Sequence, residues 1–227
     1  NIKIEEDGNI IIANQSTAKI PTQNILIEGD KSIYNKNVSE LFLTGNVKFF
    51  DDLNNVYVES EKAIFNSKTN KLLAIGITLI QIEDTYDIYS KDILYDRNSM
   101  KISSKFETSI LDNLDNIYIL NDGFLFDTFK EIISSKRTTV IDKNRNNYSF
   151  DLAKVNLKTR EIAGKEVVVN FEDSFFGNEK NDPILKGKST TSDDEKTIIN
   201  KAVFSTCNIK NKKCRGWEVQ SDEFKHN

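Results

Sequence analysis

Few side chains in this sequence could do chemistry, and they do not come together in a recognised pattern. The single histidine, His226, stands beside the end of the chain, and the two cysteines, Cys207 and Cys214, stand in the same terminal stretch. A zinc site draws its ligands from Cys, His and carboxylate side chains at regular spacing. One His and two Cys do not complete such a set, so we expect no metal site. A Gly-rich phosphate loop is also missing, and we expect no cofactor.

Paired carboxylates are the remaining candidates for catalysis. The pairs Asp51-Asp52 and Asp193-Asp194 could be read as the two acids of a glycosidase. Both pairs stand in strings typical of turns, where a carboxylate is solvated, whereas acid–base catalysis needs a carboxylate in a concave and partly dry site. The sequence therefore favours binding or scaffolding over catalysis, and we expect no enzyme activity.

Composition indicates which elements must position these residues. The 227 residues include 28 Ile and 14 Phe but only 7 Ala and 1 Met. β-branched and aromatic residues favour strands, and the good helix formers are scarce. An all-β fold is predicted. The net charge is −4 with the signs interspersed, which argues against nucleic acid as a partner. The chain begins with Asn1 and shows no signal peptide, so we expect a processed or trimmed chain.

A repeat of about thirty residues organises the chain. In each copy an anchor residue is preceded, at two, seven and nine positions, by apolar or small side chains and is followed by Asn or Asp. Apolar residues alternate within a copy, as in a half-buried strand, and the step from Ser60 to Ala63 breaks the alternation as a β-bulge would. Each repeat thus predicts two strands and two turns. The anchors are Tyr34, Phe65, Tyr95, Phe126 and Val155.

The repeat is interrupted once, and its inner face has two possible structures. Residues 172–197 contain Pro183 and a polar string, so we expect an inserted mobile loop there, between a repeated core over 1–171 and terminal strands over 198–227. If every repeat directs its apolar side chains to one face, the stacked sheets either interdigitate into a solid core or enclose a long apolar groove. The residue pattern alone leaves both open.

Two stretches resemble a known family. The unit from Leu41 to Val47 (LFLTGNV), with Ala63-Ile64-Phe65-Asn66 after it, resembles the OstA-type β-jellyroll of the lipopolysaccharide transport proteins. The tail resembles the junction where outer-membrane assembly proteins of the LptD type pass from a periplasmic jellyroll into a β-barrel. This resemblance implies a twisted antiparallel jellyroll whose apolar inner groove holds the acyl chains of lipopolysaccharide, on the periplasmic side of the outer membrane of a Gram-negative cell. The tail segments are Ala202 to Cys207, then Cys214, then Trp217 to Asn227.

The resemblance also implies partners. These are lipopolysaccharide, a neighbouring bridge jellyroll that pairs with the N-terminal repeat around Ile10 to Tyr34, a β-barrel that this sequence does not contain, and the plug lipoprotein of that barrel. Cys207 and Cys214 form either a local disulfide or disulfides with barrel cysteines, as the family does, since the periplasm is oxidising. Two other readings stay open: a stand-alone bridge jellyroll like LptA or LptC, and a β-solenoid adhesin or carbohydrate-binding domain.

The template and the resemblance together predict the residues that line the groove. They are the inward positions of the first strand of each repeat and of one second strand. These residues are Val47, Phe49, Val56, Val58, Ala63, Phe65, Ile88, Ile93, Tyr95, Ile117, Ile119, Phe124 and Phe126.

Overall fold

The protein consists of antiparallel strands almost throughout. The structure is a computed structural model that describes residues 2–82, 85–171, 184–192, 196–205 and 218–226. The chain divides into two compact units, residues 1–113 and residues 114–227. The boundaries at 171 and 197 that the sequence indicated delimit an inserted loop and are a separate prediction. Each unit is described by itself.

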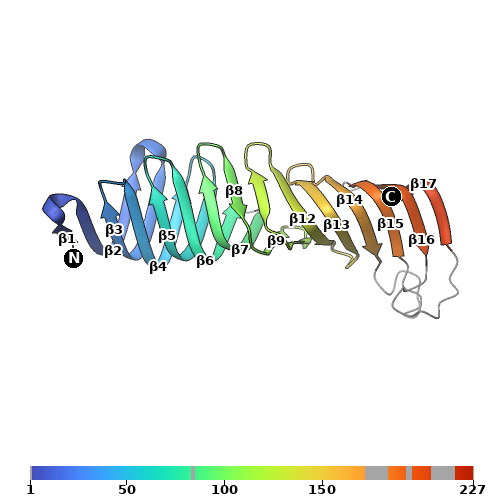
Figure 1. The fold of residues 1–227 in the computed structure, drawn as a ribbon, viewed down its shortest axis with the longest axis horizontal. Coiled ribbons are helices and arrows are strands. Elements are labelled where there is room, and N and C mark those ends of the chain that lie inside the picture. Colours follow the sequence, from blue (N-terminus) through green and yellow to red (C-terminus); the bar gives the residue numbers. More distant parts are fainter. Residues whose placement is uncertain (1, 83–84, 172–183, 193–195, 206–217, 227) are drawn as a thin grey trace. The chain divides into compact units, whose positions relative to one another are not determined.

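Unit 1 is a ladder of strands in which neighbours along the chain pair antiparallel from β1 to β8, and β9 pairs with the first part of β7 (Figure 1). Its elements are β1 (Ile2–Glu5), the 3-10 helix η1 (Glu6–Gly8), β2 (Ile10–Ile20), the 3-10 helix η2 (Pro21–Gln23), β3 (Ile25–Asn35), β4 (Glu40–Asp51), β5 (Val56–Asn66), β6 (Lys71–Ile82), β7 (Tyr86–Asp96), β8 (Lys101–Ser104) and β9 (Thr108–Asp112).

Unit 2 repeats this arrangement. β10 and β11 both pair with β12, and the strands from β12 to β17 pair in sequence order. The described strands of both units pair antiparallel, so the predicted all-β antiparallel fold is confirmed. This pairing argues against the β-solenoid alternative, since solenoids prefer parallel ladders. The strands are β10 (Ile117–Leu120), β11 (Phe124–Asp127), β12 (Ile132–Ile141), β13 (Asn147–Asn156), β14 (Ile162–Asn170), β15 (Ile184–Ser192), β16 (Thr197–Ser205) and β17 (Glu218–His226).

An inserted mobile loop was expected over 172–197; residues 172–183 and 193–195 of it lie outside the described residues, and the structure differs from the expectation over 184–192. Residues 184–192 form β15, which pairs with β14 on one side and β16 on the other. Its Ser and Thr residues are typical of loops, but Leu185 and Thr190 both face the interior and are buried. Thr190 can be buried because its hydroxyl donates to the carbonyl oxygen of Ile198 at 2.9 Å.

Most long strands bend near the middle. The pairing register shifts between Thr44 and Val47 in β4, and between Ser60 and Lys62 in β5, where the sequence predicted a bulge. An extra residue on one strand of a pair bends that strand and increases its twist. Residues with left-handed φ mark the bends: Gln15, Asn46, Gly76, Asp92, Arg137, Glu166 and Lys201.

The bends fold unit 1 into two layers (Figure 1). The inward Phe49 of β4 contacts Phe65 of β5 and Tyr95 of β7, with ring centroids 5.8 Å and 6.2 Å apart. In the ladder β4 and β7 are separated by β5 and β6, so the contact with Tyr95 must cross between layers. Layer A consists of residues 31–35, 40–44, 62–66, 71–75, 92–96 and β8, and layer B of residues 25–28, 47–51, 56–60, 77–82, 86–90 and β9.

The bend in β14 gives a first testable prediction. Glu166 has a φ of 50° there, and its side chain is exposed. Glu166→Val is expected to lower the free energy of unfolding by about 1–3 kcal/mol, because a β-branched residue is strained at positive φ. Glu166→Gly should be at least as stable as the parent, since glycine adopts this conformation without strain. Denaturant unfolding of the two variants measures the difference, and equal stabilities would show that the bend carries no strain.

Candidate functional site

Most of the predicted groove-lining residues are buried on the inner faces. Their side chains are at most 5% exposed, and their neighbours in sequence point outward. Burial establishes which face they occupy, while their contact with a lipid stays a prediction. They are Val47, Phe49, Val56, Val58, Ala63, Phe65, Ile88, Ile93, Tyr95, Phe124 and Phe126.

Ile117 and Ile119 do not follow the prediction. Ile117 is 36% exposed and Ile119 is half-buried, while Tyr118 and Leu120 of the same strand are buried. The step from Leu120 to Phe124 is one residue longer than the corresponding step from Ser60 to Ala63. The extra residue reverses which side chains of β10 point inward. The repeat template, which counts back from Phe126, therefore assigns the wrong face here.

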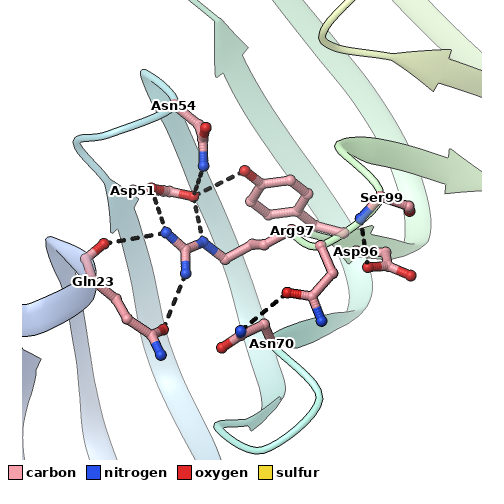
Figure 2. A network of polar contacts seen from close by, with 9 residues as sticks. Gln23, Asp51, Asn54, Asn70, Asp96, Arg97 and Ser99 are labelled. Carbon is pink, nitrogen blue, oxygen red and sulfur yellow. Dashed lines mark hydrogen bonds and ion pairs between the residues drawn. The ribbon is translucent and has the colours of Figure 1, made fainter.

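A buried ion pair joins the two layers of unit 1 on the side where the strands end in turns. We call this side the seam. Arg97, directly after β7 of layer A, donates from Nε to Asp51 Oδ2 at 2.6 Å and from Nη2 to Asp51 Oδ1 at 3.0 Å (Figure 2). Asp51 ends β4 in layer B. The Arg97 side chain is 8% exposed and that of Asp51 is 0% exposed, so the pair is shielded from water.

Further hydrogen bonds complete this network. Arg97 Nη1 and Nη2 donate to the side-chain and backbone oxygens of Gln23 at 3.0 Å and 3.1 Å, and Asn54 Nδ2 and the Tyr95 hydroxyl donate to Asp51 Oδ2 at 2.7 Å and 2.8 Å. The turn that carries Arg97 is itself fixed, because the backbone N–H of Arg97 donates to the carbonyl oxygen of Asn70 at 3.1 Å. Five residues from three separate segments thus share one polar cluster.

The protonation states in this network follow from its geometry. Burial on its own would raise the pKa of Asp51, but the hydrogen bonds from Arg97, Asn54 and Tyr95 and the charge of Arg97 outweigh it and hold that pKa below its ordinary value. Burial and the nearby negative charge of Asp51 raise the pKa of Tyr95. The network therefore holds a carboxylate, a guanidinium and a neutral phenol at neutral pH.

Asp51 corrects one expectation from the sequence. The Asp51-Asp52 pair was expected to lie in a solvated turn, and Asp52 does so, whereas Asp51 is fully buried. The alternation of Val47, Phe49 and Asp51 along the chain indicated the burial of Asp51, since it places this side chain on the inner face. Its partner could not be found in the same way, because Arg97 is 46 positions further along the chain.

In unit 2 a cavity of about 540 Å³ lies between inward-facing residues of the two halves of the bent strands. Tyr148, near the start of β13, and Ile162, opposite its end, line the same cavity. A straight strand would hold these side chains far apart, so the bend must bring the two halves face to face. Buried Tyr118, Val140 and Phe150 form its apolar wall.

The rim of this cavity is polar and carries more positive than negative charge among its described residues. Lys143, Arg160 and Lys196 line it together with a single carboxylate, Asp142. Asp142 is held by the backbone N–H groups of Asn144 and Asn146 at 2.8 Å and 2.9 Å, among other contacts. An apolar wall behind a charged rim suits an amphiphile whose tail enters and whose head stays in water.

Other predicted features have no described counterpart. Cys207 and Cys214 lie outside the described residues, so their disulfide pairing stays a prediction. Over the ranges that the structure describes, no group of three or more His, Cys, Asp or Glu side chains could hold a metal ion. Neither of the short helices found there is long and apolar enough to cross a membrane.

Similarity between this chain and known proteins is low. No protein-family model matches the chain, and no curated protein sequence matches it. Among solved structures, the chain is similar to LptH from Pseudomonas aeruginosa, the LptA-homologous periplasmic component of a conserved lipopolysaccharide transport device. The alignment is 8% identical, covers 63% of this chain and 83% of LptH, and has a TM-score of 0.28. A similarity of this extent assigns no function to the chain.

Proposed function

We propose that this protein binds lipopolysaccharide and passes it on without chemical change, in the periplasm of a Gram-negative cell. The acyl chains lie between the inner faces of the bent strands, and the sugar and phosphate groups stay in water at the turns. The cavity of about 540 Å³ in unit 2 is the observation that carries this proposal, because it joins an apolar wall to a charged rim. Each methylene that enters gains about 0.8 kcal/mol.

The sequence supports the same function independently of the cavity. The stretch from Leu41 to Val47 and the repeat resemble the lipopolysaccharide transport jellyrolls, in which this face holds acyl chains. Leu41, Leu43 and Val47 alternate and are buried, as an inner face requires. Lipid binding therefore has support from the sequence pattern and from the interior of unit 2.

A more specific role is inferred from the resemblance of the tail, residues 202–227. We propose that the chain is the periplasmic part of an outer-membrane assembly protein of the LptD type, which delivers lipopolysaccharide to a barrel closed by a plug lipoprotein. A stand-alone bridge jellyroll fits the same observations. In both roles a neighbouring jellyroll pairs with the N-terminal repeat around Ile10 to Tyr34, as the resemblance implies. β1, which precedes this stretch and pairs with its residues Ile10 to Ala13, has Ile2 and Ile4 74% and 63% exposed.

Site-specific crosslinking tests lipid binding. A photoreactive diazirine amino acid of leucine size at Val140 or Phe124, both inward in unit 2, is expected to capture lipopolysaccharide on illumination, since both positions face the interior. The same amino acid at Thr139, which neighbours Val140 on the outer face, or at the exposed Lys62 or Lys91 should capture little. Gel shifts that react with anti-lipopolysaccharide antibody measure capture. Equal capture at inner and outer positions would overturn the proposed function.

A further inference from the structure

The seam of unit 1 is closed by side chains. On the bend side each strand passes from one layer to the other, so the backbone itself connects the layers. On the seam side Arg97 of layer A reaches Asp51 of layer B and Gln23 beside it, which stand 46 and 74 positions earlier in the chain. Separating the layers at the seam would break these contacts without breaking a strand pairing.

The network fixes one separation between the layers. Arg97 holds Asp51 through two parallel hydrogen bonds, and such a planar pair tolerates little displacement. Both carboxylate oxygens of Asp51 accept from Arg97, and Oδ2 also accepts from Asn54 and Tyr95. Apolar side chains of similar volume would hold two layers together at least as well as a buried ion pair does. A charged pair differs in that it has two distinct states, engaged inside or hydrated outside.

We propose that Arg97 and Asp51 form a latch that keeps unit 1 closed to hydrocarbon chains and that must open before unit 1 can hold them. This inference rests on the proposed function and names the regulation of its interior. Behind the latch, Phe49, Phe65 and Tyr95 are in contact across the layers and are at most 1% exposed. Acyl chains enter only if these rings separate.

Because of the latch, the two units differ in how they accept an acyl chain. In unit 2 the corresponding space between the halves of the strands holds the cavity, whose rim reaches the exposed Lys143 and Asn144. Unit 2 therefore accepts a chain as it stands, whereas unit 1 accepts one after opening. A lipid can shift this opening only by binding the open form more tightly than the closed form.

Crosslinking at Ile93, inward on β7 and 1% exposed, tests the latch with lipopolysaccharide as the probe. In the parent protein the diazirine amino acid at Ile93 should capture little lipid while that at Val140 captures it. Arg97→Gln should raise capture at Ile93 on the order of tenfold, as expected when loss of a charge-assisted contact shifts the population of the open form. Arg97→Lys, which cannot make the planar pair, and Gln23→Ala should give smaller increases and keep the test informative if Arg97→Gln does not fold.

A matched control separates a latch from a purely structural ion pair. Gly76→Val weakens the fold at the bend, where Gly76 has a φ of +89° and no atom lies within 4 Å of an added Cβ, and it leaves the seam intact. It should not raise capture at Ile93. Unchanged capture in the folded latch variants, or an equal rise in Gly76→Val, would overturn the latch while lipid capture at Val140 stands. Absence of capture at Val140 would instead overturn the proposed function.

Discussion

Replacement of Arg97 by alanine is expected to lower the free energy of unfolding by about 3–5 kcal/mol, because it leaves the carboxylate of Asp51 buried without its charge partner. The side chain of Asp51 is 0% exposed. Its hydrogen bonds from Asn54 and Tyr95 remain in the variant, so the loss of stability measures the contribution of the guanidinium. Denaturant unfolding of the parent and the variant under identical conditions measures it.

Exposed ion pairs supply the control for this prediction. Lys48 and Glu59 pair at 3.7 Å on the outer face, with side chains 45% and 42% exposed. Lys48→Ala should cost less than about 1 kcal/mol, since such pairs are screened and hydrated. The double variant Asp51→Asn/Arg97→Ala should lose less than the sum of its single variants, with a coupling of about 0.5–3 kcal/mol. A coupling near zero would mean that the two side chains do not interact.

The same ion pair makes the free energy of unfolding depend on pH. The folded-state pKa of Asp51 lies below its ordinary value, so its contribution to stability is present above the unfolded pKa of an aspartate, about 3.9, and is lost as the pH falls through the folded pKa. The difference between the parent and Arg97→Ala should therefore shrink on acidification, as the carboxyl of Asp51 takes up a proton in both proteins. A difference that grows on acidification would contradict this assignment of charge.

The sequence predicted the fold class because its signal is local. Alternation in segments such as Val56 to Phe65 requires only that neighbouring side chains point to opposite faces, and the break between Ser60 and Ala63 coincides with a register shift. The positions of the bends had a weaker signal. Carboxylates accept hydrogen bonds at the bends: Asp30 accepts one from the side-chain amide of Asn46 at 2.9 Å, and Asp92 accepts one from the backbone N–H of Gly76 at 2.7 Å. Each of these contacts joins residues of different strands, so a local pattern does not indicate it.

The seam and the cavity could not be predicted from the sequence, for a different reason. Arg97 and Asp51 meet because two turns from opposite layers face each other, which depends on the angle of every bend between them. The cavity likewise depends on turns that are distant in sequence, such as those that contain Lys143 and Arg160. A template that repeats every thirty residues treats the two units alike, so it also missed that unit 1 has rings in contact where unit 2 has space.

Phe49→Ala tests whether the interior of unit 1 is filled, and we expect it to lower the free energy of unfolding by about 3–5 kcal/mol. Phe49 is 1% exposed and its ring contacts Phe65 and Tyr95, so truncation removes apolar burial and leaves a void between the layers. Phe50, the next residue, lies half-buried on the outer face with its ring 4.8 Å from that of Tyr57. Phe50→Ala should cost only about 1 kcal/mol, since that aromatic pair is partly in water.

The contrast between these neighbours decides between a packed and a hollow unit 1. If the layers already stood apart and water or lipid filled the gap, truncation of Phe49 would lower the free energy of unfolding only a little, and the two variants would have similar stabilities. If the layers pack as the ring contacts indicate, Phe49→Ala leaves a void between them and removes one of the rings that must separate before a hydrocarbon chain enters. Addition of lipopolysaccharide should then restore stability to Phe49→Ala more than to Phe50→Ala, because a ligand that binds only the folded state raises the free energy of unfolding.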